Sequence, residues 1–128
     1  MQEISEAHED YLKAIYLISK KNKGGWVSNK EISEFLKKKP ASVSNMLYKL
    51  NAQDLIYWKP RSPIRLTKKG KKIVKELLVN FSRLQEFFKI VLNLKNQQLI
   101  QDLCCKIEHF ITPEVSNALQ ELITLEAI

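Results

Sequence analysis

VSNKEISEFLKKKPASVSNMLYKLNAQDLIYWKPRSPIRLT, residues 27–67, is the stretch that decides the fold of this 128-residue chain. Its segments 29–37 and 41–51 carry apolar residues at the three- and four-residue spacing of a helix with one buried face. The turn Lys38-Lys39-Pro40 separates the two segments. The side chains expected inside are Ile32, Phe35, Leu36, Val43, Met46, Leu47 and Leu50. This pattern predicts a helix-turn-helix.

Two short segments with strand character follow the second helix. Residues 55–58 and 64–66 are separated by Lys59-Pro60-Arg61-Ser62-Pro63, a loop that its prolines stiffen. A recognition helix followed by a small basic hairpin is typical of a winged helix-turn-helix, which reads DNA. The second helix would then leave a polar face for a partner: Ser42, Ser44, Asn45, Tyr48 and Lys49.

The rest of the chain predicts further helices. Ser5 can cap a first helix that runs to about Lys20, and Thr67 can cap a long helix of about 24 residues. Helices are also expected at about 96–110 and from Pro113 to about Glu126. The fold class is therefore mainly α, with a winged helix-turn-helix DNA-binding domain (1–70) followed by an all-helical dimerisation domain (71–128). The broad apolar faces beyond the wing indicate subunit pairing, and the alternative is a monomer in which the same faces form the core.

Charge is distributed unevenly along the chain, whose net charge is +7. Residues 1–96 hold 20 basic and 9 acidic side chains, a net charge of +11, whereas residues 97–128 hold 1 and 5, a net charge of −4. Between Lys59 and Lys75 there are eight Lys or Arg residues and no Asp or Glu. Because this run abuts the predicted recognition helix, it indicates a surface for phosphates.

The sequence contains no apolar run long enough to span a membrane, and its N-terminus lacks the layout of a signal peptide. We therefore expect a cytoplasmic protein. Only three glycines are present, with no glycine-rich cradle or oxyanion-type element, and this argues against an enzyme.

A candidate metal-binding set lies in Cys105-Lys106-Ile107-Glu108-His109. At 100° per residue, Glu108 and His109 fall within roughly 60° and 40° of Cys105, so a helix would present all three on one face. Cys104 points instead to the apolar side of that helix, where we expect a buried, inert thiol.

The chain resembles the iron- and manganese-dependent transcriptional repressors typified by the diphtheria toxin repressor and the manganese transport regulator. The resemblance covers essentially all 128 residues. It is carried by His8-Glu9-Asp10-Tyr11-Leu12, Ala14-Ile15-Tyr16, Pro40-Ala41-Ser42-Val43-Ser44, Leu66-Thr67-Lys68-Lys69-Gly70 and the segment from Cys105 to His109. It implies a short form, without the C-terminal barrel-like domain of some members.

The resemblance also implies one divalent ion per subunit, held by Asp10, Cys105, Glu108 and His109. Asp10 is similar to the manganese-responsive branch and Cys105 to the iron-responsive branch. Such a donor set is borderline in softness, so we expect Fe(II) or Mn(II), with Zn(II) or Co(II) as alternatives in vitro.

Some positions depart from the family's pattern. Ser82 stands where the family usually has a histidine on the long helix, and Lys13 where manganese regulators have a second glutamate. Glu86 matches one ligand of the iron branch's ancillary site, but Ser82 and Gln101 replace its imidazoles. A second metal site is therefore not expected.

Together with the winged helix, the resemblance implies a homodimeric, metal-responsive repressor of metal-homeostasis genes that binds a double-stranded DNA operator, with no membrane partner and no small-molecule substrate. Base contacts are expected from Ala41, Ser42 and Asn45. Phosphate contacts are expected from Lys39, Lys49, Arg61, Arg65 and Lys68. His8 is expected to be exposed, because it lies about 200° around the helix from Asp10.

Two other interpretations remain open. In the first, a winged-helix regulator binds DNA without metal and answers a thiol oxidant or a protein partner through Cys105. In the second, Cys105 and His109 serve an enzyme as nucleophile and base.

Overall fold

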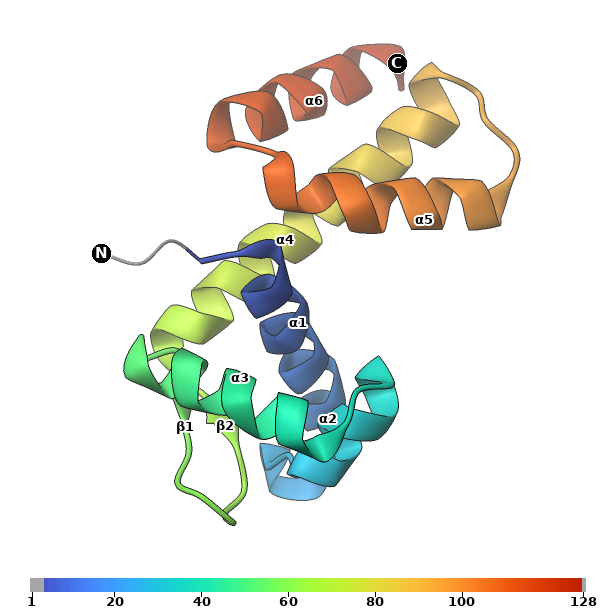
Figure 1. Cartoon of the computed structure of the whole chain (residues 1–128). Coiled ribbons are helices and arrows are strands. Elements are labelled where there is room, and N and C mark those ends of the chain that lie inside the picture. Colours follow the sequence, from blue (N-terminus) through green and yellow to red (C-terminus); the bar gives the residue numbers. More distant parts are fainter. Residues whose placement is uncertain (1–3, 128) are drawn as a thin grey trace. The chain divides into compact units, whose positions relative to one another are not determined.

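A computed structural model describes residues 4–127 of the chain. The chain divides into two compact units, the first ending at Val74 and the second beginning at Lys75. The boundary falls inside the long helix α4 (Lys68–Glu86). Figure 1 shows helices in both units, and the first unit also holds a two-stranded sheet of β1 (Ile56–Tyr57) and β2 (Arg65–Leu66).

The first unit contains three α-helices, the wing hairpin and the first residues of α4 (Figure 1). Ser5 caps α1 (Glu6–Lys21), and its side chain accepts a hydrogen bond from the backbone N–H of His8. A capping box between Ser28 and Glu31 starts α2 (Asn29–Leu36), and Pro40 occupies the first turn of α3 (Pro40–Ala52). The side chains of Leu12, Ile15, Ile32, Val43, Leu47 and Leu50 are fully buried. The helices and caps predicted from the sequence are therefore confirmed.

Phe35 differs from the prediction. It was expected inside but is 47% exposed, and it lines a shallow groove with Ile18 and Lys21. The two-turn helix α2 buries only Ile32. Because Phe35 lies about 100° around the helix from Leu36, which is half-buried, it falls on the flank of the buried stripe.

The wing is a short antiparallel hairpin of β1 (Ile56–Tyr57) and β2 (Arg65–Leu66). Ile56 pairs with Leu66 and Tyr57 with Arg65. Val27 extends the hairpin through an antiparallel bridge to Ile64. The predicted order of strand, proline-containing loop and strand is confirmed.

Thr67 begins α4 as expected, because its hydroxyl accepts a hydrogen bond from the backbone N–H of Gly70 at 3.1 Å. At Gly70 the helix lies directly on the backbone of Leu55. A Cβ added to Gly70 would meet the carbonyl oxygen of Leu55 at 2.2 Å. That carbonyl is also held in place, since it accepts a hydrogen bond from the backbone N–H of Thr67 at 3.1 Å.

The variant Gly70→Ala is therefore expected to lower the free energy of unfolding by about 1–3 kcal/mol, the usual cost of overpacking. Helix propensity alone would predict the opposite, because alanine is favoured over glycine by about 1 kcal/mol. Urea unfolding measures the difference, with Lys71→Ala at an exposed neighbouring position as the control. Equal or higher stability of Gly70→Ala would contradict the close contact.

The second unit contains the rest of α4, α5 (Gln97–Ile107) and α6 (Pro113–Glu126). Its core is built on Leu84, Ile100 and Cys104, against which partly buried residues pack: Phe81, Phe88, Leu94, Ile107, Ile111 and Leu119. The buried environment predicted for Cys104 is confirmed. Thr112 caps α6 by accepting a hydrogen bond from the backbone N–H of Val115, as expected from Pro113 in its first turn.

Two predicted helices end earlier than expected. The long helix is α-helical only to Glu86 and continues as a π-helical turn, η2 (Phe87–Val91). The helix predicted at 96–110 is α-helical from Gln97 to Ile107 and then tightens into a 3₁₀ turn, η3 (Glu108–Phe110). A periodicity of 100° per residue therefore does not extend to the candidate ligands Glu108 and His109.

Candidate nucleic-acid interface and metal centre

The recognition helix α3 presents the polar face that its sequence predicts. Ala41, Ser42, Asn45 and Lys49 are exposed, while Val43 on the opposite face is fully buried. Lys39 is exposed at the N-cap position of the helix. Ser44 is half-buried, and its hydroxyl accepts a hydrogen bond from the side-chain amide of Asn29 at 3.0 Å. The exposed set can meet base edges and phosphates at the same time.

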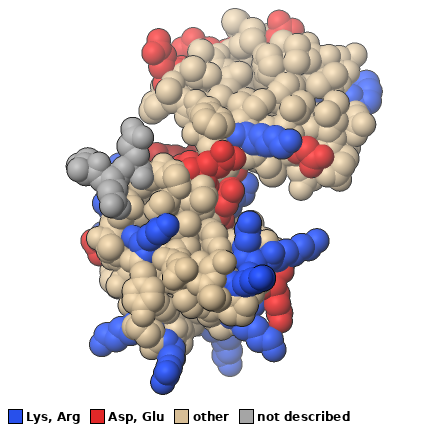
Figure 2. Space-filling view, in the orientation of Figure 1, with Lys and Arg blue, Asp and Glu red and all other residues tan. Residues whose placement is uncertain are grey.

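The wing adds cations beside this helix. Arg61 is exposed at the tip of the loop and has a left-handed backbone, with φ 66°. Lys68 is exposed in the first turn of α4. In Figure 2, Lys and Arg side chains project from the unit that carries α2, α3 and the wing. All of the basic run except Lys75 belongs to the winged-helix unit, and its members there are exposed apart from the half-buried Arg65.

Arg65 has other contacts within the same unit. Its guanidinium lies over the ring of Trp26, 4.3 Å from the centroid, and donates a hydrogen bond to the carbonyl of Gly24. The residue is half-buried. These contacts tie β2 to the segment before α2, so a phosphate contact from Arg65 would be made by a side chain that already has a structural role.

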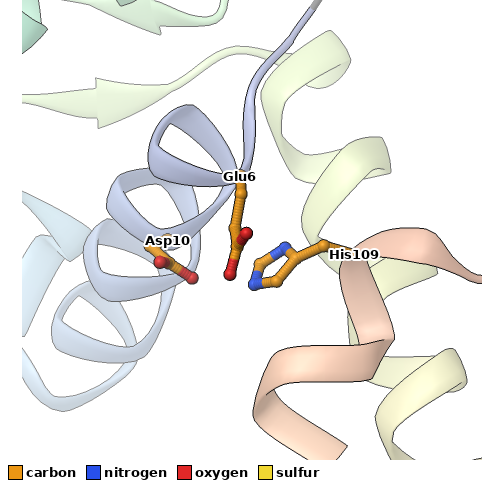
Figure 3. Close-up of side chains that lie close together, drawn as sticks. All are labelled: Glu6, Asp10 and His109. Carbon is orange, nitrogen blue, oxygen red and sulfur yellow. The ribbon is translucent and has the colours of Figure 1, made fainter.

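On α1, two carboxylates lie one turn apart. Glu6 and Asp10 are both exposed, and each offers a carboxylate oxygen within 4.8 Å of the other's. Figure 3 shows both side chains on the same side of the helix. Their i, i+4 spacing places them on one helix face. Sequence reasoning selected Asp10 and missed Glu6, although this spacing was a usable signal.

At the end of α5 the other candidate ligands have different environments. Glu108 is only 1% exposed, and its Oε1 lies 3.9 Å from Nε2 of His109. Figure 3 shows the imidazole of His109 projecting from its turn. Cys105 is exposed on α5. Among residues 4–127, these three side chains do not form a group with all ligand atoms within 4.8 Å of one another. The α-helix on which the common face was predicted ends at Ile107, so Glu108 and His109 stand on the 3₁₀ turn that follows it, and their role as ligands together with Cys105 stays a prediction.

His8 was expected to be exposed, and this was wrong. It is half-buried, with Nδ1 2.5 Å from the hydroxyl of Ser5 and Nε2 3.4 Å from the side-chain amide of Gln53. Burial lowers the pKa of His8, and the nearby ammonium of Lys49 lowers it further. The face of α1 opposite Asp10 therefore packs beside the C-terminal end of the recognition helix.

Comparison with known proteins identifies the family. A family model described as the iron-dependent repressor, N-terminal DNA-binding domain, matches residues 3–63. An uncharacterised HTH-type transcriptional regulator of Methanocaldococcus jannaschii is 31% identical over 91% of this chain and 92% of its own length. The HTH-type transcriptional regulator MntR of Shouchella clausii is 30% identical over 90% of this chain and 78% of its own. This chain belongs to the iron-dependent repressor family.

A solved structure of the manganese regulator SloR has the same fold, with a TM-score of 0.74 at 29% identity. The match covers 91% of this chain and 53% of that one, so the chain spans about half the length of that solved structure. Members of the iron-dependent repressor family are metal-dependent transcriptional regulators. The predicted family, fold class and function class, a metal-responsive DNA-binding regulator, are therefore confirmed. Within residues 4–127, no helix is both long enough and apolar enough to cross a membrane.

Proposed function

We propose that this chain is a homodimeric repressor in the cytoplasm that binds a double-stranded DNA operator when a divalent cation, Fe(II) or Mn(II), is present. The observation that carries the proposal is the exposed polar face of α3 beside a basic wing in the same compact unit. A helix of this kind enters the major groove, and the flanking cations hold the backbone on either side.

Base contacts would come from the exposed face of α3. Asn45 can pair with an adenine through its amide, Ser42 can donate to or accept from a base edge, and the methyl group of Ala41 suits a thymine methyl. Phosphates would be held by Lys39, Lys49, Arg61, Arg65 and Lys68. Arg65 would do so while keeping its contact with Trp26.

The residues present suit a divalent cation of borderline softness. Asp10, with Glu6 one turn away, supplies carboxylate oxygens from the first unit. Glu108 and His109 supply a carboxylate and an imidazole from the second, 3.9 Å apart. Cys105, the remaining candidate, would add a thiolate and favour Fe(II) or Zn(II). When bound, the cation would supply positive charge between these acidic groups and a link between the two units.

Such a link can regulate DNA binding only if the cation binds more tightly to the arrangement of the two units that binds DNA than to other arrangements. Donors that belong to two units can all bind one cation in some arrangements of the units and not in others. If the DNA-competent arrangement satisfies them best, a coupling free energy of about 1–3 kcal/mol raises operator affinity roughly 5- to 150-fold. The carboxylates of α1 and the groups at the end of α5 are therefore the regulatory residues in this proposal.

A second copy of the chain would cover the apolar side chains of the second unit. Several large ones are exposed there: Val79, Ile90, Leu92, Leu99, Phe110, Val115, Leu122 and Leu125. A two-fold dimer would present two recognition helices to half-sites one or more DNA turns apart.

Titration of a chelator into a gel-shift assay tests the proposal. The DNA is a duplex that the full-length chain enriches from a random-sequence pool in the presence of Mn(II). We expect chelation to weaken binding 5- to 150-fold, and added Mn(II) or Fe(II) to restore it. Tight binding that the chelator leaves unchanged would support the metal-independent regulator instead, for which the exposed thiol of Cys105 is the candidate sensor.

A further inference from the structure

The winged-helix unit contains a groove between the recognition helix and the wing. It has a volume of about 790 Å³ and is lined by Pro40, Ala41, Ser44 and Tyr48 of α3, among others, and by Trp58 and Arg61 of the wing. Because α3 forms one wall and the wing forms another, the distance between these two elements sets the shape of the groove. A duplex that meets both elements must fit that shape.

The base of the hairpin is held in the core by the buried side chains of Ile56, Ile64 and Leu66, whereas the loop beyond β1 must be positioned by other contacts. Each strand has only two residues, and a two-stranded hairpin of this size is marginal alone. On the β2 side the wing is anchored to the start of α2. Val27 and Ile64 exchange backbone hydrogen bonds of 3.0 and 2.7 Å, and Arg65 stacks on Trp26. These contacts hold one strand but do not reach α3.

On the β1 side the wing is joined to the recognition helix by an aromatic pair. Tyr48 of α3 and Trp58, the residue after β1, pack edge to face with ring centroids 4.8 Å apart and an interplanar angle of 84°. This is the preferred geometry of such pairs. Tyr48 is 56% exposed, so its ring contributes little to the core. Its position is explained better by the contact with Trp58 than by burial.

The tip of the wing is a tight turn closed on itself. The hydroxyl of Ser62 donates to the carbonyl of Lys59 at 2.6 Å and accepts from the N–H of Lys59 at 3.0 Å. The N–H of Ser62 also donates to the carbonyl of Lys59 at 3.0 Å. Arg61 is therefore carried on a turn with its own hydrogen bonds. The tip would move with the strands as a rigid body. A contact at Trp58 can therefore determine where Arg61 lies.

We propose that the Tyr48–Trp58 pair is a positioning element that sets the wing against the recognition helix, so that Arg61 reaches a phosphate while α3 lies in the major groove. This inference rests on the proposed function, because it concerns the same DNA complex. An edge-to-face pair of this kind is expected to raise the affinity of the chain for its DNA duplex by a factor of about 2 to 12. Neither ring needs to touch DNA for this effect.

A double-mutant cycle between Tyr48 and Arg61 tests the proposal. Affinity for the enriched duplex is measured in the full-length chain with Mn(II) for the wild type, Tyr48→Leu, Arg61→Ala and the double variant. We expect Tyr48→Leu to weaken binding about 2- to 12-fold, and Arg61→Ala to lose most of its effect in the Tyr48→Leu background. Tyr48→Phe keeps the ring and should behave as the wild type. Tyr57→Leu, an exposed tyrosine of β1, is the matched control and should leave the effect of Arg61→Ala unchanged.

Additive effects of Tyr48→Leu and Arg61→Ala would overturn the inference, because they would mean that Tyr48 contacts DNA by itself or only supports the fold. If Tyr48→Leu unfolds, the same cycle with Trp58→Leu makes the test from the other ring. A wild-type chain that enriches no duplex would defeat the proposed function itself. A chain that enriches a duplex but shows additivity would defeat only the role of the aromatic pair.

Discussion

Raising the salt concentration from 50 to 200 mM is expected to weaken operator binding about 1,000-fold. If a dimer neutralises about six phosphates, the logarithm of the affinity falls with the logarithm of the salt concentration with a slope near −5. The cations that would release counterions are exposed on one unit, at Lys39 and Lys49 of α3, Arg61 of the wing and Lys68 of α4. Binding that depends on these residues must therefore depend strongly on salt.

Fluorescence anisotropy of the enriched duplex at several salt concentrations measures the slope. Arg61→Ala should make the slope less steep by about 2 per dimer, one phosphate being lost from each subunit. Lys106→Ala removes an exposed cation of α5 in the second unit and serves as the charge-matched control, with the slope unchanged. An affinity that varies little with salt would count against the wing and the basic run as the binding surface.

The winged helix could be predicted from sequence because its signals are local. Ser5 and Thr67 cap helices whose buried stripes begin within the next two turns, and Pro40 fixes the start of α3. Phe35 could not be placed in this way. The elements that pack against a two-turn helix decide which of its sides is buried. These elements lie elsewhere in the sequence, so the residues of the helix alone do not indicate the buried side.

The candidate site was harder to predict because it depends on where an α-helix ends. The assignment of Asp10 as a ligand stays a prediction, and the nearby carboxylate of Glu6, one turn away on α1, was not named from the sequence. Glu108 and His109 were assigned to one face with Cys105 on the assumption that the α-helix continues past Ile107. At Glu108 the chain changes to a 3₁₀ turn, so the angles between successive side chains differ there from the 100° that the prediction used. No residue pattern before Ile107 signals this change.

Asp10→Ala and His109→Ala are each expected to remove the rise in operator affinity that metal produces, about 5- to 150-fold, while leaving the metal-free affinity near that of the wild type. Each variant removes a donor from a different unit, so each breaks the link on which the coupling depends. Asp10 is exposed on α1, and its truncation to alanine should leave the buried core, such as Leu12 and Ile15, unchanged.

The measurement combines operator affinity with and without Mn(II) and elemental analysis of protein purified anaerobically. Glu34→Ala removes an exposed carboxylate of α2 and is the control for the loss of one negative charge, with the metal response retained. Equal loss of affinity with and without metal would mean that Asp10 and His109 are structural. Unchanged metal content in both variants would exclude them as ligands.

Cys105→Ala and Glu6→Ala, compared in the same assay, determine which further donor completes the set. Glu6 shares a helix face with Asp10, one turn away, and offers a hard carboxylate oxygen. Cys105 offers a soft sulfur and stands before the 3₁₀ turn that carries Glu108 and His109. If Glu6 is the donor, Glu6→Ala abolishes the response to Mn(II) and Cys105→Ala leaves it intact, because manganese prefers oxygen ligands. If Cys105 is the donor, Cys105→Ala reduces the response to Fe(II) more than the response to Mn(II), because the thiolate favours the softer ion.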